Sequence, residues 1–139
     1  MIRAVLDTNI IVSAHLQEEG HAALILELAM GKRFRCFASA PLFAEYEEVL
    51  RRPKFGLDEK RVTRSIRELR RNVRVVRPTR KLKVTKDSDD NLVLECALAA
   101  RADYVVTGNG RDFPKQFQDT RVIGPKQFLM VLAAEPGLA

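Results

Sequence analysis

Several carboxylates in this sequence stand where the chain leaves an apolar run or enters a helix. Asp7 directly follows the apolar run 3–6, and Asp112 comes shortly after a later apolar run. Asp90 closes the acidic tetrapeptide 87–90, which opens a strongly apolar, helix-like stretch. Because ligands of open parallel sheets bind outside the carboxyl ends of the strands, we expect these acids to gather at that edge.

A further carboxylate, Glu45, lies on an expected helix whose apolar stripe centres near Leu42 and Tyr46. At about 100° per residue, Glu45 lies at the edge of that stripe, whereas the two glutamates after Tyr46 point further out. Glu45 is therefore the carboxylate of this helix that is best placed to face inward.

Converging carboxylates repel one another and are costly unless a cation neutralises them. Oxygen-rich sites without His or Cys suit Mg²⁺ or Mn²⁺, and no Cys/His set in this chain has zinc spacing. Such metals activate water and neutralise the charge that develops on a phosphodiester. Each acid alone also has a structural interpretation: Asp7 could cap a helix, 87–90 could complement a helix dipole, and Glu45 could pair with an arginine.

The charge of +6 is unevenly distributed over the 139 residues. Residues 51–86 contain 15 Lys and Arg against three Asp and Glu, a local net charge of +12, and the other 103 residues have a net charge of −6. Such asymmetry suggests a polyanionic partner, most often nucleic acid. An acidic metal site beside a basic segment is the layout of a metal-dependent nuclease.

The helix expected over 57–71 has two opposite faces. Its apolar face is Val62, Ile66 and Leu69. Four cations recur at i, i+4, i+7 and i+11 on the opposite side and form a basic stripe: Lys60, Arg64, Arg67 and Arg71. We expect this stripe to bind RNA phosphates; the alternatives are a solvated helix face and a dock for an acidic protein segment.

The rest of the chain alternates expected strands with expected helices. Strands are predicted over 3–6, 34–38, 73–76, 104–107 and 121–123. Helices are predicted over about 10–14, 21–30, 41–52, 57–71, 91–101 and 125–133, the first capped by Thr8 or Asn9. A basic loop, 78–86, precedes the acidic tetrapeptide. This alternation predicts one α/β domain, 1–139, with a mainly parallel sheet covered on both faces.

Two observations bear on location. No apolar run approaches the roughly 18 residues of a membrane helix. Asp7 also stands where a signal peptide would still be apolar. We therefore expect a cytoplasmic protein that does not contact membranes.

Four segments of the chain resemble PIN (PilT N-terminus) domains, of the kind found as toxins of VapBC-like toxin–antitoxin pairs. They are 4–13 (AVLDTNIIVS), 41–55, 87–91 (DSDDN) and 104–113 (YVVTGNGRDF). The resemblance implies a three-layer α/β/α sandwich with a short, mainly parallel sheet. It also implies Mg²⁺- or Mn²⁺-dependent endonucleolytic cleavage of single-stranded RNA, leaving a 5′-phosphate and a 3′-hydroxyl. Toxin-like members are usually homodimers held inactive by a small antitoxin protein.

The same resemblance implies roles for individual residues. Asp7, Glu45 and Asp90 match the family's first three acids, which are catalytic and bind the metal. Asn9 and Thr107 match its polar supporting residues.

The family's fourth acid commonly follows Val-Thr-Gly, and this chain has Asn109 there. Asparagine can still offer a carbonyl oxygen to a metal, but without charge. Asp112, three residues later, can replace the missing acid as a catalytic and metal-binding group.

Two alternatives follow from these departures. Because of Asn109, the chain could be a catalytically weakened PIN-like domain that only binds RNA. It could also be a phosphoacceptor signalling domain, in which Thr107 and Lys126 would serve the acceptor, although no Asp ends the third expected strand.

Overall fold

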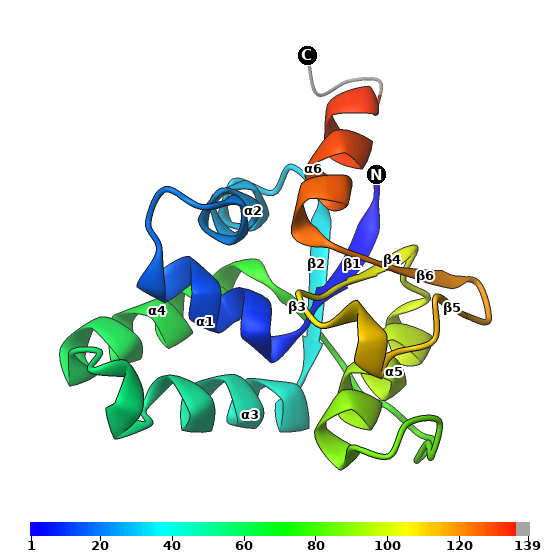
Figure 1. The fold of residues 1–139 in the computed structure, drawn as a ribbon, viewed down its shortest axis with the longest axis horizontal. Helices are drawn as coiled ribbons and strands as arrows, with labels where there is room; N and C mark the ends of the chain where they lie inside the picture. The colour runs from blue at the N-terminus through cyan, green and yellow to red at the C-terminus, as the bar shows by residue number, and fades with distance from the viewer. Residues whose placement is uncertain (136–139) are drawn as a thin grey trace.

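The computed structural model describes residues 1–135, in which six α-helices flank a six-stranded sheet (Figure 1). The last four residues of the expected domain range 1–139 lie outside the described residues. No helix of the described part is both long and apolar enough to cross a membrane.

The sheet is mainly parallel, as predicted. Its strands are, in chain order, β1 (Arg3–Leu6), β2 (Arg35–Ser39), β3 (Arg74–Val76), β4 (Tyr104–Val106), β5 (Gln116–Phe117) and β6 (Thr120–Ile123). Their order across the sheet is β3-β2-β1-β4-β6-β5, and only β5 runs antiparallel to its neighbour. The carboxyl ends of β1 and β4, next to each other at the centre, therefore bring Asp7 close to Thr107.

The helices follow the predicted order. They are α1 (Thr8–Leu16), α2 (His21–Met30), α3 (Ala40–Leu50), α4 (Glu59–Asn72), α5 (Ser88–Ala100) and α6 (Pro125–Ala134), with short 3₁₀ turns η1 (Pro53–Phe55) and η2 (Gly110–Asp112). The prediction that Thr8 or Asn9 caps the first helix is wrong. Asp7 is the cap: its carboxylate accepts a hydrogen bond from the Thr8 amide at 2.8 Å, so the helix begins as soon as β1 ends.

Helices cover the two faces of the sheet, which confirms the sandwich. Arg3 donates from β1 to the Ala100 carbonyl of α5 on one face. On the other face, Phe128 of α6 packs edge-on against Phe34 and Tyr104, with ring centroids 5.0 and 6.0 Å apart. Figure 1 shows α1, α2 and α4 on the side of the sheet away from α5. The core lies between these layers, where the last three residues of β1, the last two of β4 and the inner side of α5 are buried.

The antiparallel strand β5 was missing from the sequence prediction. It pairs with β6 through a tight turn at Gln118, which has a φ of 52° and whose carbonyl accepts a hydrogen bond from the Gln116 side chain. A strand of two residues is too short to leave an alternating pattern, so the sequence carries no periodic signal for it.

Candidate active site

Asp7 is held at the carboxyl edge of the sheet by a fully buried strand. Ala4, Val5 and Leu6 have no exposed surface, and Asp7 itself is only 7% exposed. One of its carboxylate oxygens caps α1, and the other accepts a hydrogen bond from the Thr107 hydroxyl at 2.7 Å. Burial raises the pKa of Asp7 above its usual value, the two hydrogen bonds lower it, and the charges of nearby acids raise it further.

Thr107 connects the polar groups of this edge. Its hydroxyl donates to Asp7 and accepts from the side-chain amide of Asn9 at 3.3 Å and from the backbone amide of Asn109 at 3.0 Å. Asn9 in turn accepts from the Gly108 amide at 3.1 Å. A hydroxyl has one proton and two lone pairs, so Thr107 is fully used. The two predicted supporting residues therefore fix Asp7 against the loop that follows β4.

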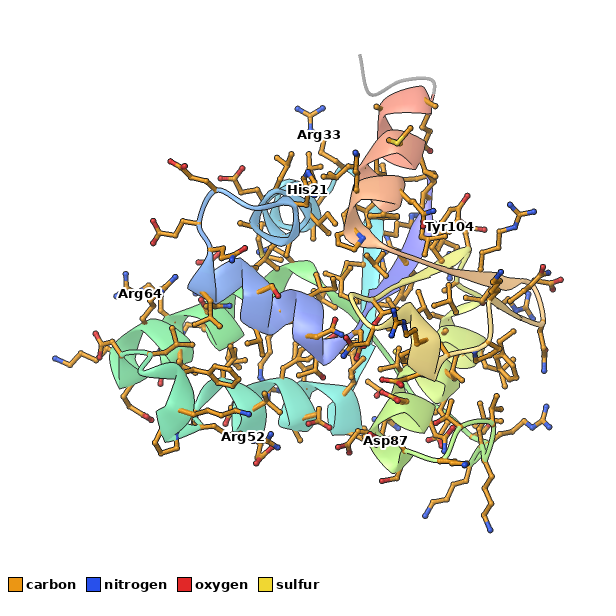
Figure 2. All side chains as sticks on the ribbon, viewed as in Figure 1. His21, Arg33, Arg52, Arg64, Asp87 and Tyr104 are labelled. Atoms are coloured by element: carbon orange, nitrogen blue, oxygen red, sulfur yellow. The ribbon has the colours of Figure 1, made fainter. Side chains whose placement is uncertain are left out.

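Asp90 and Asp112 line a cleft of about 490 Å³ beside this edge, together with Asp87. Burial raises the pKa of Asp90 to about 6, and the charges of Asp7, Asp87 and Asp112 add to the shift. Figure 2 shows Asp87 at the end of the sheet where α3 and α5 begin. Three of the predicted acids, Asp7, Asp90 and Asp112, therefore lie close enough to repel one another.

Glu45 interacts most strongly with Asp89, not with Asp7, Asp90 or Asp112. Tyr46, its neighbour on α3, donates a buried hydrogen bond to the Leu6 carbonyl and thereby ties α3 to the end of β1. Glu45 is half-buried, and its pKa is raised to about 7 by burial, then by a hydrogen bond with Asp89 and the charges of Asp89 and Glu48. The sequence analysis gave Asp89 no role of its own. The contact between α3 and α5 that brings it to Glu45 leaves no periodic signal.

The loop after β4 places its two candidate residues differently. Asn109 is exposed, and the contact recorded for it at this edge is the hydrogen bond from its backbone amide to Thr107. Asp112 lies in η2, lines the cleft, and contributes to the raised pKa values of both Asp7 and Asp90. Asp112 is therefore the residue that this loop brings to the other acids.

The described residues contain no group of three or more His, Cys, Asp or Glu side chains that could hold a metal ion by themselves. This does not conflict with the donor chemistry of Mg²⁺, which keeps several waters and is usually bound by one or two carboxylates together with substrate phosphates. Burial, and after it the charges of neighbouring acids, raises the pKa values of Asp7 and Asp90, so a cation beside these carboxylates would be favourable. A hydrated divalent ion fits these residues, whereas a ready-made protein cage is not formed.

Cations lie at the acidic cleft, and most belong to the basic segment 51–86, for which the sequence predicts a polyanionic partner. Lys86 and Arg111 line the cleft itself. Five exposed cations lie in or next to the loop predicted over 78–86: Arg77, Arg80, Lys81, Lys83 and Lys86. The loop is anchored on α5, because the Leu82 amide donates to Glu95 at 3.0 Å and Thr85 exchanges hydrogen bonds with Asn91. Its sequence signal was the density of cations immediately before an acidic tetrapeptide.

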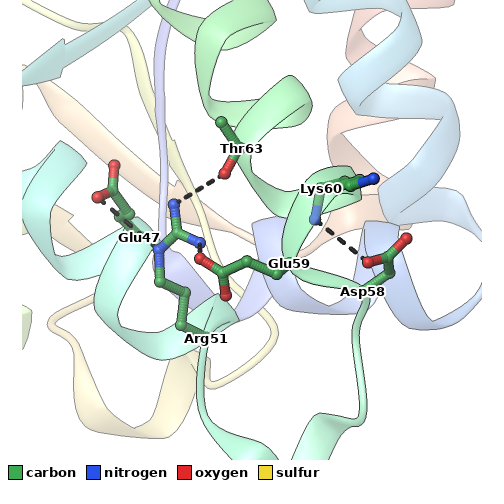
Figure 3. A network of polar contacts seen from close by, with 6 residues as sticks. All are labelled: Glu47, Arg51, Asp58, Glu59, Lys60 and Thr63. Carbon is green, nitrogen blue, oxygen red and sulfur yellow. Dashed lines mark hydrogen bonds and ion pairs between the residues drawn. The ribbon is translucent and has the colours of Figure 1, made fainter.

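The basic stripe of α4 is exposed, as predicted, and Val62, Ile66 and Leu69 are buried opposite it. A polar network fixes the start of α4 to the end of α3 (Figure 3). In it, Arg51 pairs with Glu47 and Glu59 and donates to Thr63. Figure 2 shows Arg64, on the stripe, at the opposite side of the molecule from Asp87. The stripe and the acidic cleft are thus separate surfaces.

Comparison with known proteins gives one result. A search of curated proteins finds no match. A family model described as a PIN domain matches residues 3–111, which is most of the chain and includes Asp7, Glu45, Asp90 and Asn109. PIN domains are typically nucleases and usually use divalent metals. With its mainly parallel sheet and its acids at the carboxyl edge, this chain belongs to the PIN domain family.

Proposed function

We propose that this protein is a Mg²⁺- or Mn²⁺-dependent endoribonuclease that hydrolyses phosphodiester bonds in single-stranded RNA. The observation that carries the proposal is the crowding of Asp7, Asp90 and Asp112 at the carboxyl end of β1 and β4, where burial, and after it the charges of neighbouring acids, raises the pKa values of Asp7 and Asp90. Carboxylates arranged in this way favour a divalent cation. The choice of RNA as the substrate follows the family resemblance.

The residues divide the work between holding the ion and holding the substrate. Asp7, Asp90 and Asp112 would hold the ion, and Asn109 would offer a neutral oxygen at the rim. Glu45, hydrogen-bonded to Asp89, is the fourth carboxylate, and its pKa of about 7 makes it able to exchange a proton near neutral pH. When bound, the ion neutralises charge on the phosphodiester and activates water.

Substrate binding is supported by the basic surfaces of the chain. Lys86 and Arg111 line the cleft together with the carboxylates, so a phosphate that enters it has cations to bind. The stripe of α4 is a second, separate basic surface, and its members form no ion pair within residues 1–135: Lys60, Arg64, Arg67 and Arg71. Unpaired cations of this kind are available to RNA phosphates.

The proposal is tested by cleavage of a labelled single-stranded RNA by purified protein. Cleavage is expected to stop in EDTA and to return when Mn²⁺ or Mg²⁺ is added in excess. Undiminished cleavage in EDTA would contradict the metal dependence. RNA binding without cleavage at any metal concentration would favour the alternative, a PIN-like domain weakened by Asn109. The phosphoacceptor alternative has no acceptor at the end of β3, where Val76 is followed by Arg77.

We further propose that the protein is the cytoplasmic toxin of a toxin–antitoxin pair and acts as a homodimer. Support comes from a groove of about 610 Å³ between α1, α2 and α4, which is lined by apolar residues such as Leu26 and Met30, by Arg64, and by three glutamates, Glu18, Glu27 and Glu68. Such a groove suits a small antitoxin with a segment that carries apolar and basic side chains. Expression should arrest growth, an adjacent gene for a small protein should relieve the arrest, and the Asp7→Asn variant should be harmless. Arrest that persists in Asp7→Asn would separate toxicity from the acidic site.

A further inference from the structure

The amino end of the sheet is the opposite of its carboxyl end in charge. β1, β2 and β3 each begin with an arginine: Arg3, Arg35 and Arg74. Arg3 has structural contacts, because it donates to the Ala100 carbonyl and lies over the Phe37 ring at 4.5 Å. Arg35 and Arg74 are exposed, and their side chains make no hydrogen bond or ion pair within residues 1–135.

Arg35 and Arg74 belong to a basic pocket of about 310 Å³. The pocket is also lined by Lys32, from the turn after α2, and Arg71, from the last turn of α4. No Asp or Glu lines it. The nearest acid recorded for a lining group is Glu135, 3.9 Å from the amino terminus of Met1. Four side-chain cations from two stretches of the chain, 32–35 and 71–74, thus line one hollow.

Helix dipoles account for only part of this charge. Both α2 and α4 end near the pocket, and a helix C-terminus carries roughly half a negative charge, so the two ends offset about one of the four cations. The remaining cations repel one another unless an anion occupies the hollow. The surplus of positive charge is therefore not explained by the fold.

The geometry suits phosphate. Phe37 is in register with Arg74 on the neighbouring strand, and Arg35 precedes Phe37 by two residues, so Arg35 and Arg74 point to the same face of the sheet. The two arginines are thus diagonal neighbours on adjacent strands, and guanidinium groups provide the planar donors that bind phosphate oxygens. A cavity of about 310 Å³ is at the small end of ligand pockets and admits one phosphate-bearing unit rather than a folded partner.

We propose that this basic pocket, Lys32, Arg35, Arg71 and Arg74, binds the phosphate groups of a nucleic-acid strand. The choice of nucleic acid rests on continuity, because Arg71 is also the last member of the α4 stripe, and Arg67 and Arg64 continue the line beyond the pocket. A nucleic-acid strand bound in the pocket would also contact Arg67 and Arg64, whereas a free phosphate ion would contact only the pocket. The pocket lies at the other end of the sheet from Asp7, so the strand binds here without meeting the repulsion of the carboxylates.

The experiment measures binding without cleavage. A fluorescein-labelled single-stranded RNA is titrated in EDTA with the wild-type protein, with Arg35→Gln/Arg74→Gln, and with Lys115→Gln/Arg121→Gln. The last is a matched control, because both side chains are exposed and Arg121 lies on β6, separated from β2 by β1 and β4. Equal thermal midpoints of the three proteins would show that each variant is folded.

The pocket variant should bind about tenfold more weakly at low salt, and its slope of log K against log salt should fall by about 1.4, at ~0.7 per single-strand phosphate contact. The control variant should bind RNA with nearly the wild-type affinity and nearly the wild-type salt slope. Equal losses in the two variants, or none in either, would overturn the proposal. Because the assay contains EDTA and uses uncleaved RNA, it measures binding alone. Its result therefore tests the pocket whether or not the protein is a nuclease.

Two competitors identify the anion. Unlabelled RNA should displace the labelled strand at a much lower phosphate concentration than inorganic phosphate does, because the strand also contacts the stripe. Displacement at equal phosphate concentrations would overturn the nucleic-acid assignment in favour of a free phosphate site. Stronger displacement by polyglutamate than by RNA, compared at equal charge, would show that the pocket takes an acidic protein segment, and the proposal would be wrong.

Discussion

The two ends of the sheet carry opposite charges, and each carries more charge than the fold requires. At the carboxyl end, α1, α3 and α5 begin, and the positive ends of their dipoles favour anions such as Asp7 and Asp87. At the amino end, α2 and α4 end, and their negative ends favour cations such as Arg71. Burial, and after it the charges of neighbouring acids, raises the pKa values of Asp7 and Asp90, so the charged forms of these carboxylates remain disfavoured although the helix dipoles point at them. The surplus, rather than the charge itself, is what points to function.

The two ends also differ in how their side chains are held. Asp7 is buried, and Thr107 and the Thr8 amide fix both of its oxygens. Arg35 and Arg74 are exposed and have no such partners in the described part of the chain. Fixed carboxylates suit a reaction that needs one geometry, whereas free guanidinium groups suit a polymer that binds in many registers. The comparison therefore predicts that catalysis and binding can be separated by mutation.

The largest effect is expected for Asp7→Asn. This change keeps the shape of the side chain and its acceptor for the Thr8 amide, but removes the charge that favours a divalent ion. Cleavage should fall by more than the ~10–100-fold that loss of a supporting residue costs at a metal site. Binding of uncleaved RNA in EDTA should be unchanged or slightly tighter, because one repelling charge is gone.

The control is Asp119→Asn, an exposed acid on the β5–β6 turn, which should behave like wild type in both assays. Weaker binding by Asp7→Asn would show that the two ends are not separable.

A smaller effect is expected for Thr107→Val, which removes the hydroxyl that orients Asp7. Cleavage should fall by about 10–100-fold, and the metal concentration for half-maximal cleavage should rise. The free energy of unfolding in EDTA should fall by roughly 1–3 kcal/mol, because buried hydrogen-bonding groups lose their partner. Thr107→Ser keeps the hydroxyl and should restore the metal response. If Thr107→Val lowers the free energy of unfolding but leaves the metal titration unchanged, Thr107 has only a structural role.

The next effect concerns the acid that the loop after β4 supplies. We expect a change of about tenfold in metal affinity when this acid is removed. Asp112 contributes to the raised pKa values of Asp7 and Asp90, whereas Asn109 does not line the cleft. We therefore expect Asp112→Ala to weaken metal binding, since a charge a few Å from the ion is worth on the order of 1 kcal/mol or more at an effective dielectric near 20. Asn109→Asp should change the titration less. If Asn109→Asp tightens the metal and Asp112→Ala has no effect, the acid that this loop supplies has been assigned to the wrong residue.

The sequence predicted most of the acidic end, because each of its acids lies next to a regular element. Asp7 follows an apolar run and Asp90 opens an apolar helix, so the parallel order of β1 and β4 was enough to bring them together. The sequence offered Asp7, Thr8 and Asn9 as possible caps of the first helix, and the choice among them depends on the exact residue at which β1 ends. The pairing of Glu45 with Asp89 depends on how α3 packs against α5, which no local pattern encodes.

The basic pocket at the amino end was not predicted at all, because its cations come from two stretches that are far apart in the chain, 32–35 and 71–74. A signal existed nevertheless: Arg3, Arg35 and Arg74 each stand at the start of a short apolar run. In a parallel sheet, residues at the start of neighbouring strands lie side by side, and the pairing of Arg3 with Arg35 follows this rule. The net charge of residues 51–86 drew attention to α4 instead, where periodicity is easy to see. Strand starts deserve the same attention as strand ends when a sheet is parallel.

The smallest effect concerns stability and pH at the acidic end. The folded protein raises the pKa of Asp90 from 3.8 to about 6, so between these values the folded state binds more protons than the unfolded state. The contribution of Asp90 to stability is therefore most favourable below about pH 4 and is lost as the pH rises through about 6.

In EDTA, Asp90→Asn should unfold a few degrees above the wild type at neutral pH and at nearly the same temperature near pH 4. Excess Mg²⁺ should raise the wild-type midpoint and reverse the order, because the ion neutralises the charge that the variant lacks. Thermal unfolding across this pH range measures both effects, with Asp119→Asn as the control that should follow the wild type. A variant that is less stable than the wild type at neutral pH in EDTA would mean that the charge of Asp90 is compensated within the chain, and the acidic end would then carry no surplus for a metal to neutralise.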